Sequence, residues 1–130
     1  MTALQKILEP DQFVEEISKI SPLIRFSAIY FEGNFYTKTR NGVEPYLDSY
    51  QTGESMRYAV MRMIQREKHS QKIGHPDYSL TKYEKVNRVT IPLGKDGLIM
   101  FSTELEAGCD SIAKKVIEFK KKNEISCVEK

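Results

Sequence analysis

His69 and His75, with Asp77 close behind, are the side chains of this sequence that most resemble a set of metal ligands. Imidazole and carboxylate groups are common ligands of zinc and related ions. The stretch HSQKIGHPD, however, places these residues on both sides of Gly74, where we expect a helix to end, and their spacing matches no common ligand motif. We therefore interpret them as solvated side chains at a helix terminus, and we expect no metal and no cofactor.

Few residues of the sequence could act as a nucleophile or a general acid–base. Cys109 and Cys127 form neither a CxxC motif nor a disulfide framework, so we expect buried or incidental thiols in a reducing compartment. Glu15 and Glu16 are adjacent and therefore point to different sides of the helix expected there. The motifs GxxxxGK(S/T), GxGxxG and GxSxG are absent. We therefore expect that the protein is not an enzyme.

Basic side chains form the most extensive candidate functional surface. Four lie at helical spacing in the middle of the chain and one lies on a predicted strand: Arg57, Arg62, Arg66, Lys72 and Arg88. Such a group could bind phosphates or an acidic partner. Because Glu54 and Glu67 lie among them and the net charge is only +2, we interpret the group as the solvated side of an amphipathic helix. Nucleic-acid binding therefore ranks last among the functions considered.

Tyrosines in or beside the loops that flank the same helix form a further candidate. Tyr46, Tyr50 and Tyr83 could line a small-molecule pocket, with the pocket formed between a sheet and the tyrosine-rich segment 43–53. The alternative is that they cap the edge of the core, and we favour this alternative.

Composition places the chain among ordinary globular domains. It has 130 residues, of which 40% are hydrophobic and 29% charged, so we expect one domain over 1–130 with its core at about 11–122. There is neither a continuous apolar segment typical of a signal peptide nor an apolar run of 18 residues. We therefore expect a cytoplasmic protein with no membrane partner.

The first half of the chain predicts a helix and a β-hairpin. Residues 11–20 place Phe13, Ile17 and other apolar residues on one helical face, with Asp11 as the N-cap and a short turn at 3–8 before it. The hairpin joins IRFSAIYF, which is apolar on both parities, to NFYTKTR through a glycine turn. In the first strand we expect Ile24, Phe26, Ala28 and Tyr30 to share one face.

A long helix follows the hairpin, from about 52–55 to Ile73. Its predicted buried side consists of Met56, Ala59, Val60, Met63 and Ile64. Tyr58 and Met61 fall among the charged residues on the other side, where large apolar side chains are unexpected. They could therefore contact another molecule.

The last third predicts two or three strands and a closing helix. The strand at 81–93, which is broken in two near Lys85 in one interpretation, places Val89, Ile91, Leu93 and Tyr83 on one face and Arg88 on the other. We expect Lys82 and Lys85 to be solvated, whereas the strand pattern does not decide whether Arg88 is solvated or buried. After a central strand at 98–103, residues 110–122 form the helix, and the tail from 123 is expected to fray.

These elements predict an α+β fold with the order α-β-β-α-β-β-β-α. A central antiparallel sheet of about five strands carries helices on both faces, which explains why the strands at 24–31 and 98–103 are apolar on both parities.

The stretch DQFVEEISKISPLIRFSAIYFEGNFYTKTRNG resembles the opening of Roadblock (dynein light chain-like) domains, and VNRVTIPLGKDGLIMFST with the closing helix fits the same profilin-like architecture. The stretch DYSLTKYEKVNRVTIPL is also similar to small archaeal proteins with this layout. The Roadblock resemblance implies dimerisation through the middle helix and a neighbouring edge strand, and a role as a platform for small GTPases or other proteins. It implies a subunit interface that contains Tyr58, Met61, Arg62 and Gln65.

The sequence thus predicts a non-enzymatic interaction module or regulatory scaffold that forms a homodimer. One alternative is a small-molecule-sensing domain of profilin-like or PAS-like architecture. The other is a domain that binds nucleic acid through its basic middle helix.

Overall fold

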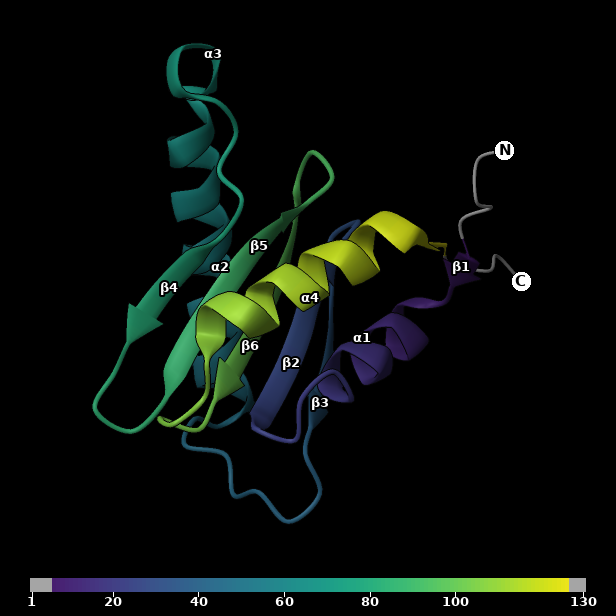
Figure 1. Cartoon of the computed structure of the whole chain (residues 1–130), viewed down its shortest axis with the longest axis vertical. Coiled ribbons are helices and arrows are strands. Elements are labelled where there is room, and N and C mark those ends of the chain that lie inside the picture. Colours follow the sequence, from purple (N-terminus) through teal and green to yellow (C-terminus); the bar gives the residue numbers. More distant parts are fainter. Residues whose placement is uncertain (1–5, 127–130) are drawn as a thin grey trace.

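The computed structural model describes residues 6–126, and its centre is a five-stranded antiparallel sheet with helices on both sides (Figure 1). The elements in chain order are β1 (Lys6–Leu8), α1 (Pro10–Ser18), β2 (Ile24–Phe31), β3 (Asn34–Thr39), α2 (Ser49–Glu67), α3 (Ser70–Ile73), β4 (Ser79–Lys82), β5 (Asn87–Leu93), β6 (Gly97–Thr103), α4 (Cys109–Lys122) and β7 (Asn123–Ile125). The predicted fold class and the five-stranded antiparallel sheet are confirmed.

The strands of the sheet lie in the order β3-β2-β6-β5-β4. β2 and β6, the two strands whose sequences are apolar on both parities, are neighbours in the middle of the sheet. The hairpin β2–β3 turns at Glu32 and Gly33, both with positive φ, a conformation that glycine adopts without steric cost. The break predicted near Lys85 is also confirmed, because β4 and β5 are separate strands that pair antiparallel.

One side of the sheet, here called the two-helix face, lies under α1 and α4 (Figure 1). Its central sheet residues are Ile29, Val89, Ile91, Ile99 and Phe101, all 0% exposed. From the helices, Phe13, Ile17 and Val116 pack on them. The Ser27 hydroxyl also donates to the Val14 carbonyl at 3.2 Å, which fixes α1 to β2. This face holds the larger of the two buried clusters of the described chain.

The opposite side, here called the one-helix face, carries α2. Its sheet residues are Phe26, Ala28, Tyr30, Leu98 and Met100. Only Met56, Ala59 and Met63 of α2 are fully buried against them. Beyond the sheet, α2 continues outward and leads into α3 at its far end (Figure 1).

Several predicted boundaries are wrong for local reasons. α1 begins at Pro10, because Glu9 rather than Asp11 is its N-cap and forms a capping box with Gln12. α2 begins at Ser49, since Asp48 accepts a hydrogen bond from the Gln51 amide at 2.8 Å. It ends at Glu67 with a C-cap at Lys68, so that the single helix expected to reach Ile73 is in fact two helices.

Both ends of the described chain contain a strand that the sequence did not predict. Residues 6–8, expected as part of a turn, form β1, and residues 123–125, expected to fray, form β7. The two strands pair in parallel, with Ile7 opposite Glu124. The remaining residues of both predictions, and Cys127, lie outside the described residues.

Two predicted face assignments are also wrong. A bulge between Ile24 and Phe26 adds one residue to β2, so Ile24 packs on the two-helix face while Phe26 lies on the other. Tyr83 does not share a face with Val89, because the strand is interrupted between Lys82 and Asn87.

Candidate functional site: an exposed helix side and a neighbouring cavity

The outward side of α2 exposes three large apolar side chains. Tyr58 is 55% exposed, Met61 57% and Ile64 47%. Residues three apart in a helix lie on neighbouring turns of the same side, so the three form one row. The expectation that Ile64 faces the core is wrong, whereas Tyr58 and Met61 lie outside as the sequence indicated. Arg62 and Gln65, the other predicted interface residues, are exposed on the same helix.

The basic candidates divide into two groups. Arg57, Arg62 and Arg66 are exposed on α2, and Lys72 is exposed on α3. Arg88 is half-buried and lines a cavity between α2 and the sheet. The exposed basic surface of α2 therefore does not continue onto the sheet, because Arg88 is not part of it.

The histidines do not form a metal site with Asp77. The His75 Nδ1 atom lies 2.8 Å from Glu67 Oε2, and His69 is the N-cap residue of α3. Within residues 6–126, no group of three or more histidine, cysteine, aspartate or glutamate side chains is arranged to hold a metal ion. Cys109 is buried against the Thr103 hydroxyl, with its Sγ atom 3.5 Å from Oγ1.

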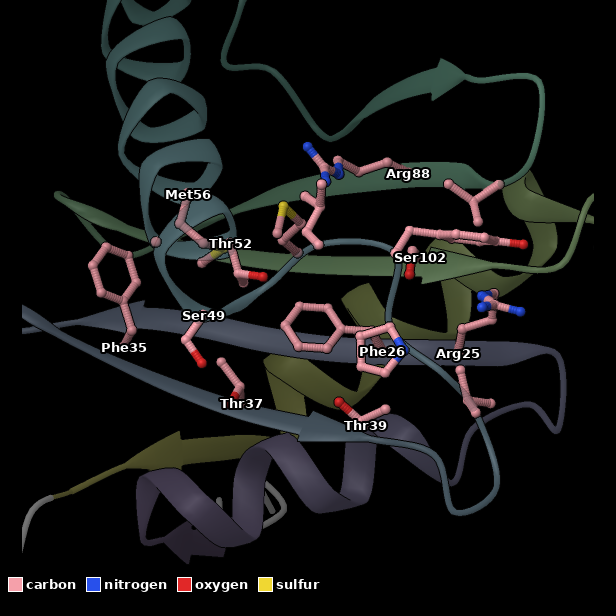
Figure 2. A pocket seen from close by; sticks show the side chains of 17 residues that line it. Arg25, Phe26, Phe35, Thr37, Thr39, Ser49, Thr52, Met56, Arg88 and Ser102 are labelled. Atoms are coloured by element: carbon pink, nitrogen blue, oxygen red, sulfur yellow. The ribbon is translucent and has the colours of Figure 1, made fainter.

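A cavity of about 340 Å³ lies between the sheet, the loop at 43–47 and the first turns of α2. Figure 2 shows how its walls converge, with Phe26 from β2, Thr39 from β3, Met56 from α2 and Ser102 from β6. Of the predicted pocket residues, Tyr46 lines this cavity, whereas Tyr50 and Tyr83 do not. The prediction of a pocket between a sheet and segment 43–53 thus named the covering segment, but it did not name the lining residues on the strands.

Arg88 extends from β5 toward α2 at one end of the cavity (Figure 2). Its Nη1 group donates a hydrogen bond to the Ser55 hydroxyl of α2, and its guanidinium carbon lies 5.5 Å from the ring centroid of Tyr83. Burial lowers the pKa of Arg88, while Tyr83 opposes that shift and Arg62 adds to it. The predicted basic-surface residue is thus a half-buried cation that contacts α2.

A second arginine, Arg25, occupies the loop end of the cavity and was not predicted from the sequence. The β2 bulge next to it allows Arg25 and Phe26 to face the same cavity. Its guanidinium lies 4.7 Å from the Tyr46 ring centroid and donates to Glu104 Oε1 at 3.1 Å. An arginine inside the apolar run IRFSAIYF was the available signal for a buried polar contact.

Glu104 contacts two arginines, Arg25 at the cavity and Arg40 directly after the edge strand β3. It accepts a hydrogen bond from Arg40 Nη2 at 2.7 Å. The hydrogen bond from Arg40, followed by that from Arg25, lowers the pKa of the Glu104 carboxyl against the opposing effect of burial. The loop that carries Glu104 is held by Asn87, whose buried amide donates to the Glu104 and Leu105 carbonyls at 3.2 and 3.3 Å.

Tyr78, which precedes β4, is not among the residues that line the cavity. It packs beside the cluster of the two-helix face, and its hydroxyl donates to the Asp110 carboxylate. That hydrogen bond is the main cause of the raised pKa of Tyr78.

Among the described residues, no helix is both long enough and apolar enough to span a bilayer.

Comparison with known proteins gives a result at the level of structure. No protein-family model matches the sequence, and no curated protein matches it. Solved structures do match. A Roadblock/LC7 domain from Streptomyces avermitilis has a TM-score of 0.60 at 10% identity, with 88% of this chain and 93% of that chain covered.

Structures of MglB are similar as well. Myxococcus xanthus MglB has a TM-score of 0.67 at 7% identity, over 86% of this chain and 82% of that one. MglB in a tetrameric arrangement has a TM-score of 0.58 at 11% identity, over 93% of this chain and 97% of that one. At these identities the likeness concerns the fold, and it confirms the Roadblock resemblance at that level. The similarity to archaeal proteins stays a prediction.

Proposed function

We propose that this chain, which has the Roadblock-like fold, is a non-enzymatic interaction or regulatory module of the cytoplasm that forms a homodimer through α2 and the edge strand β3. The observation that carries the proposal is the row of exposed apolar side chains Tyr58, Met61 and Ile64 on α2. Contiguous exposed apolar surface bordered by polar residues is typical of protein interfaces.

The composition of this side of α2 suits an interface. Tyr58, Met61 and Arg62 belong to residue types, the aromatic residues, methionine and arginine, that are enriched at interfaces relative to the rest of the surface. Charged and polar residues around them would form the hydrated periphery of the contact. The small number of α2 residues buried within the subunit leaves its outward side free for a partner.

Strand β3 offers a second element for the same contact. It lies at one end of the sheet order and pairs with β2. An edge strand presents backbone groups that a strand of another subunit could pair with. The tetrameric arrangement of MglB is consistent with self-association of this fold.

A second partner is expected for a regulatory module. The resemblance to Roadblock domains favours a small GTPase or another protein. The exposed Arg62 and Arg66 would steer an acidic partner toward α2 and give the association a marked dependence on salt. This basic group is also the basis of the nucleic-acid alternative, which stays a prediction of lower rank.

Light scattering after size-exclusion chromatography tests the dimer. We expect the mass of two 15.0 kDa chains at high protein concentration. Met61→Glu places a charge in the proposed interface and should weaken association by about a hundredfold, because an unpaired buried charge costs about 3 kcal/mol or more.

Leu105→Glu is the matched control, since Leu105 is 49% exposed on a loop outside α2 and β3. This variant should keep the wild-type mass. A monomeric mass for the wild-type chain at high concentration, or equal dissociation of both variants, would contradict the proposal.

The cavity beside α2 favours the small-molecule alternative as a second candidate. A sensory role requires a ligand that the cavity residues can recognise. The positive charge of Arg88, at the end of the cavity near α2, restricts the chemistry of that ligand.

A further inference from the structure

The cavity has the size and composition of a small-molecule site. Its volume of about 340 Å³ falls within the range of roughly 300–1,000 Å³ typical of such sites. The walls combine large apolar side chains, such as Phe26 and Met100, with hydroxyl groups, such as those of Thr52 and Ser102. Such a mixture suits a ligand with an apolar body and few polar groups.

The charges in the lining are of one sign. The described residues of the lining include Arg25 and Arg88 but no aspartate or glutamate. Arg25 is matched by Glu104, which lies just outside the lining and accepts its hydrogen bonds at 3.1 and 3.2 Å. The two arginines therefore differ in whether their charge is compensated.

Among residues 6–126, no carboxylate forms an ion pair or a hydrogen bond with Arg88. Its Nη1 group donates to the neutral Ser55 hydroxyl, and its Nε atom is the one buried side-chain nitrogen or oxygen without a hydrogen-bond partner among the side chains that the structure describes. Groups whose charges influence Arg88 are Tyr83 and Arg62, and the latter repels it. A buried guanidinium normally has an anion beside it, because burial removes the water that would stabilise the charge.

We propose that the cavity binds a small organic carboxylate, which pairs with Arg88 and places its apolar body between Phe26, Met56 and Met100. A planar carboxylate matches the fork of donors on a guanidinium and can accept hydrogen bonds from two of its N–H groups together. Ser102 and Thr52 supply hydroxyl groups for the remaining carboxylate lone pairs or for a polar substituent. The ligand thus completes a site whose positive charge is already in place.

A binding assay with simple probes tests this inference. We would titrate the ¹⁵N-labelled full chain with benzoate, phenylacetate and octanoate, and with the neutral amide of each. At least one carboxylate should saturate below about 5 mM and shift backbone signals of Arg88, Thr52 and Ser102, and its amide should bind about tenfold more weakly or not at all.

Variants locate the site. Arg88→Met should weaken binding of the carboxylate about tenfold or more, whereas Arg66→Met, which removes an exposed arginine of α2, should leave it unchanged. Thr39→Phe fills the cavity from the opposite wall and should abolish binding of acid and amide alike. The melting temperature of Arg88→Met should not fall below that of the wild type, because removal of a half-buried charge without a carboxylate beside it offsets the loss of the hydrogen bond to Ser55.

Three results would overturn the inference: no binding of any of the carboxylates at about 5 mM by the folded protein, equal affinity for acid and amide, or unchanged affinity in Arg88→Met and Thr39→Phe. None of these results depends on whether the chain is a dimer, which light scattering measures separately.

Discussion

The two faces of the sheet bury the same two central strands in different ways. On the two-helix face, α1 and α4 enclose Ile29, Ile99 and Phe101 completely. On the one-helix face, α2 covers Ala28, Leu98 and Met100, but Phe26 and Tyr30 remain half-buried, and a cavity lies beside Phe26. The comparison teaches that one face supplies most of the stability, while the other leaves surface available for binding.

The helices differ in the same way. α1 and α4 place their apolar residues inward and hold the sheet through contacts such as that of Ser27 with Val14. α2 instead divides its apolar residues between the sheet and solvent. An exposed apolar row adds nothing to the stability of a single subunit, so its presence is best explained by a partner.

Matched truncations should give the largest difference between the faces. Phe101→Ala on the two-helix face should lower the free energy of unfolding by about 3–5 kcal/mol, because it leaves a cavity in a fully buried cluster. Phe26→Ala on the one-helix face should cost about 1–2 kcal/mol, because Phe26 is half-buried and already borders a cavity.

Urea unfolding followed by circular dichroism measures both values. Equal losses, or a larger loss for Phe26→Ala, would contradict the assignment of stability to the two-helix face.

A smaller difference is expected between Glu104, beside the cavity of the one-helix face, and acidic residues of α4 in how their contribution to stability depends on pH. The pKa of Glu104 lies below its ordinary value of 4.5 in the folded state, so its contribution to stability is fully present above that pH and is lost as the pH falls through the lowered pKa. Glu104→Gln should therefore be less stable than the wild type near pH 7, and the difference should shrink below about pH 4.

Glu118→Gln on α4 is the control, since Glu118 is exposed and its contact with Lys121 spans 4.0 Å. Its stability should follow the wild type throughout the titration, because exposed ion pairs contribute little. A constant difference between Glu104→Gln and the wild type across the pH range would show that Glu104 does not stabilise the fold through its charge.

The sequence predicted elements whose signal is local and left out those set by distant contacts. The hairpin β2–β3 follows from its turn residues, and the central position of β6 follows from a run that is apolar on both parities. The pairing of β1 with β7 joins residues more than a hundred positions apart in the sequence, and no local pattern specifies it. The start of α2 is an exception, because it was missed although its signal is local: Asp48 and Gln51 form a capping box in the sequence DSYQ.

The candidate site was predicted only in part, for the same reason. Exposure of Tyr58 and Met61 followed from helical periodicity, which is local. The burial of Arg88 depends on where α2 crosses the sheet, and the orientation of Arg25 depends on a bulge. Neither can be derived from strand alternation alone.

The central claim is that α2 and β3 together form the contact with a second copy of the chain. A nitroxide attached at Lys68→Cys in a Cys127→Ser background, mixed with unmodified ¹⁵N-labelled protein, tests it directly, because Lys68 is exposed at the end of α2 and Cys109 is buried. We predict that signals of α2 and β3 in the labelled copy broaden, while those of α1 and α4 stay sharp. Broadening confined to α1 and α4, or none at a concentration where light scattering gives a dimer, would contradict the claim.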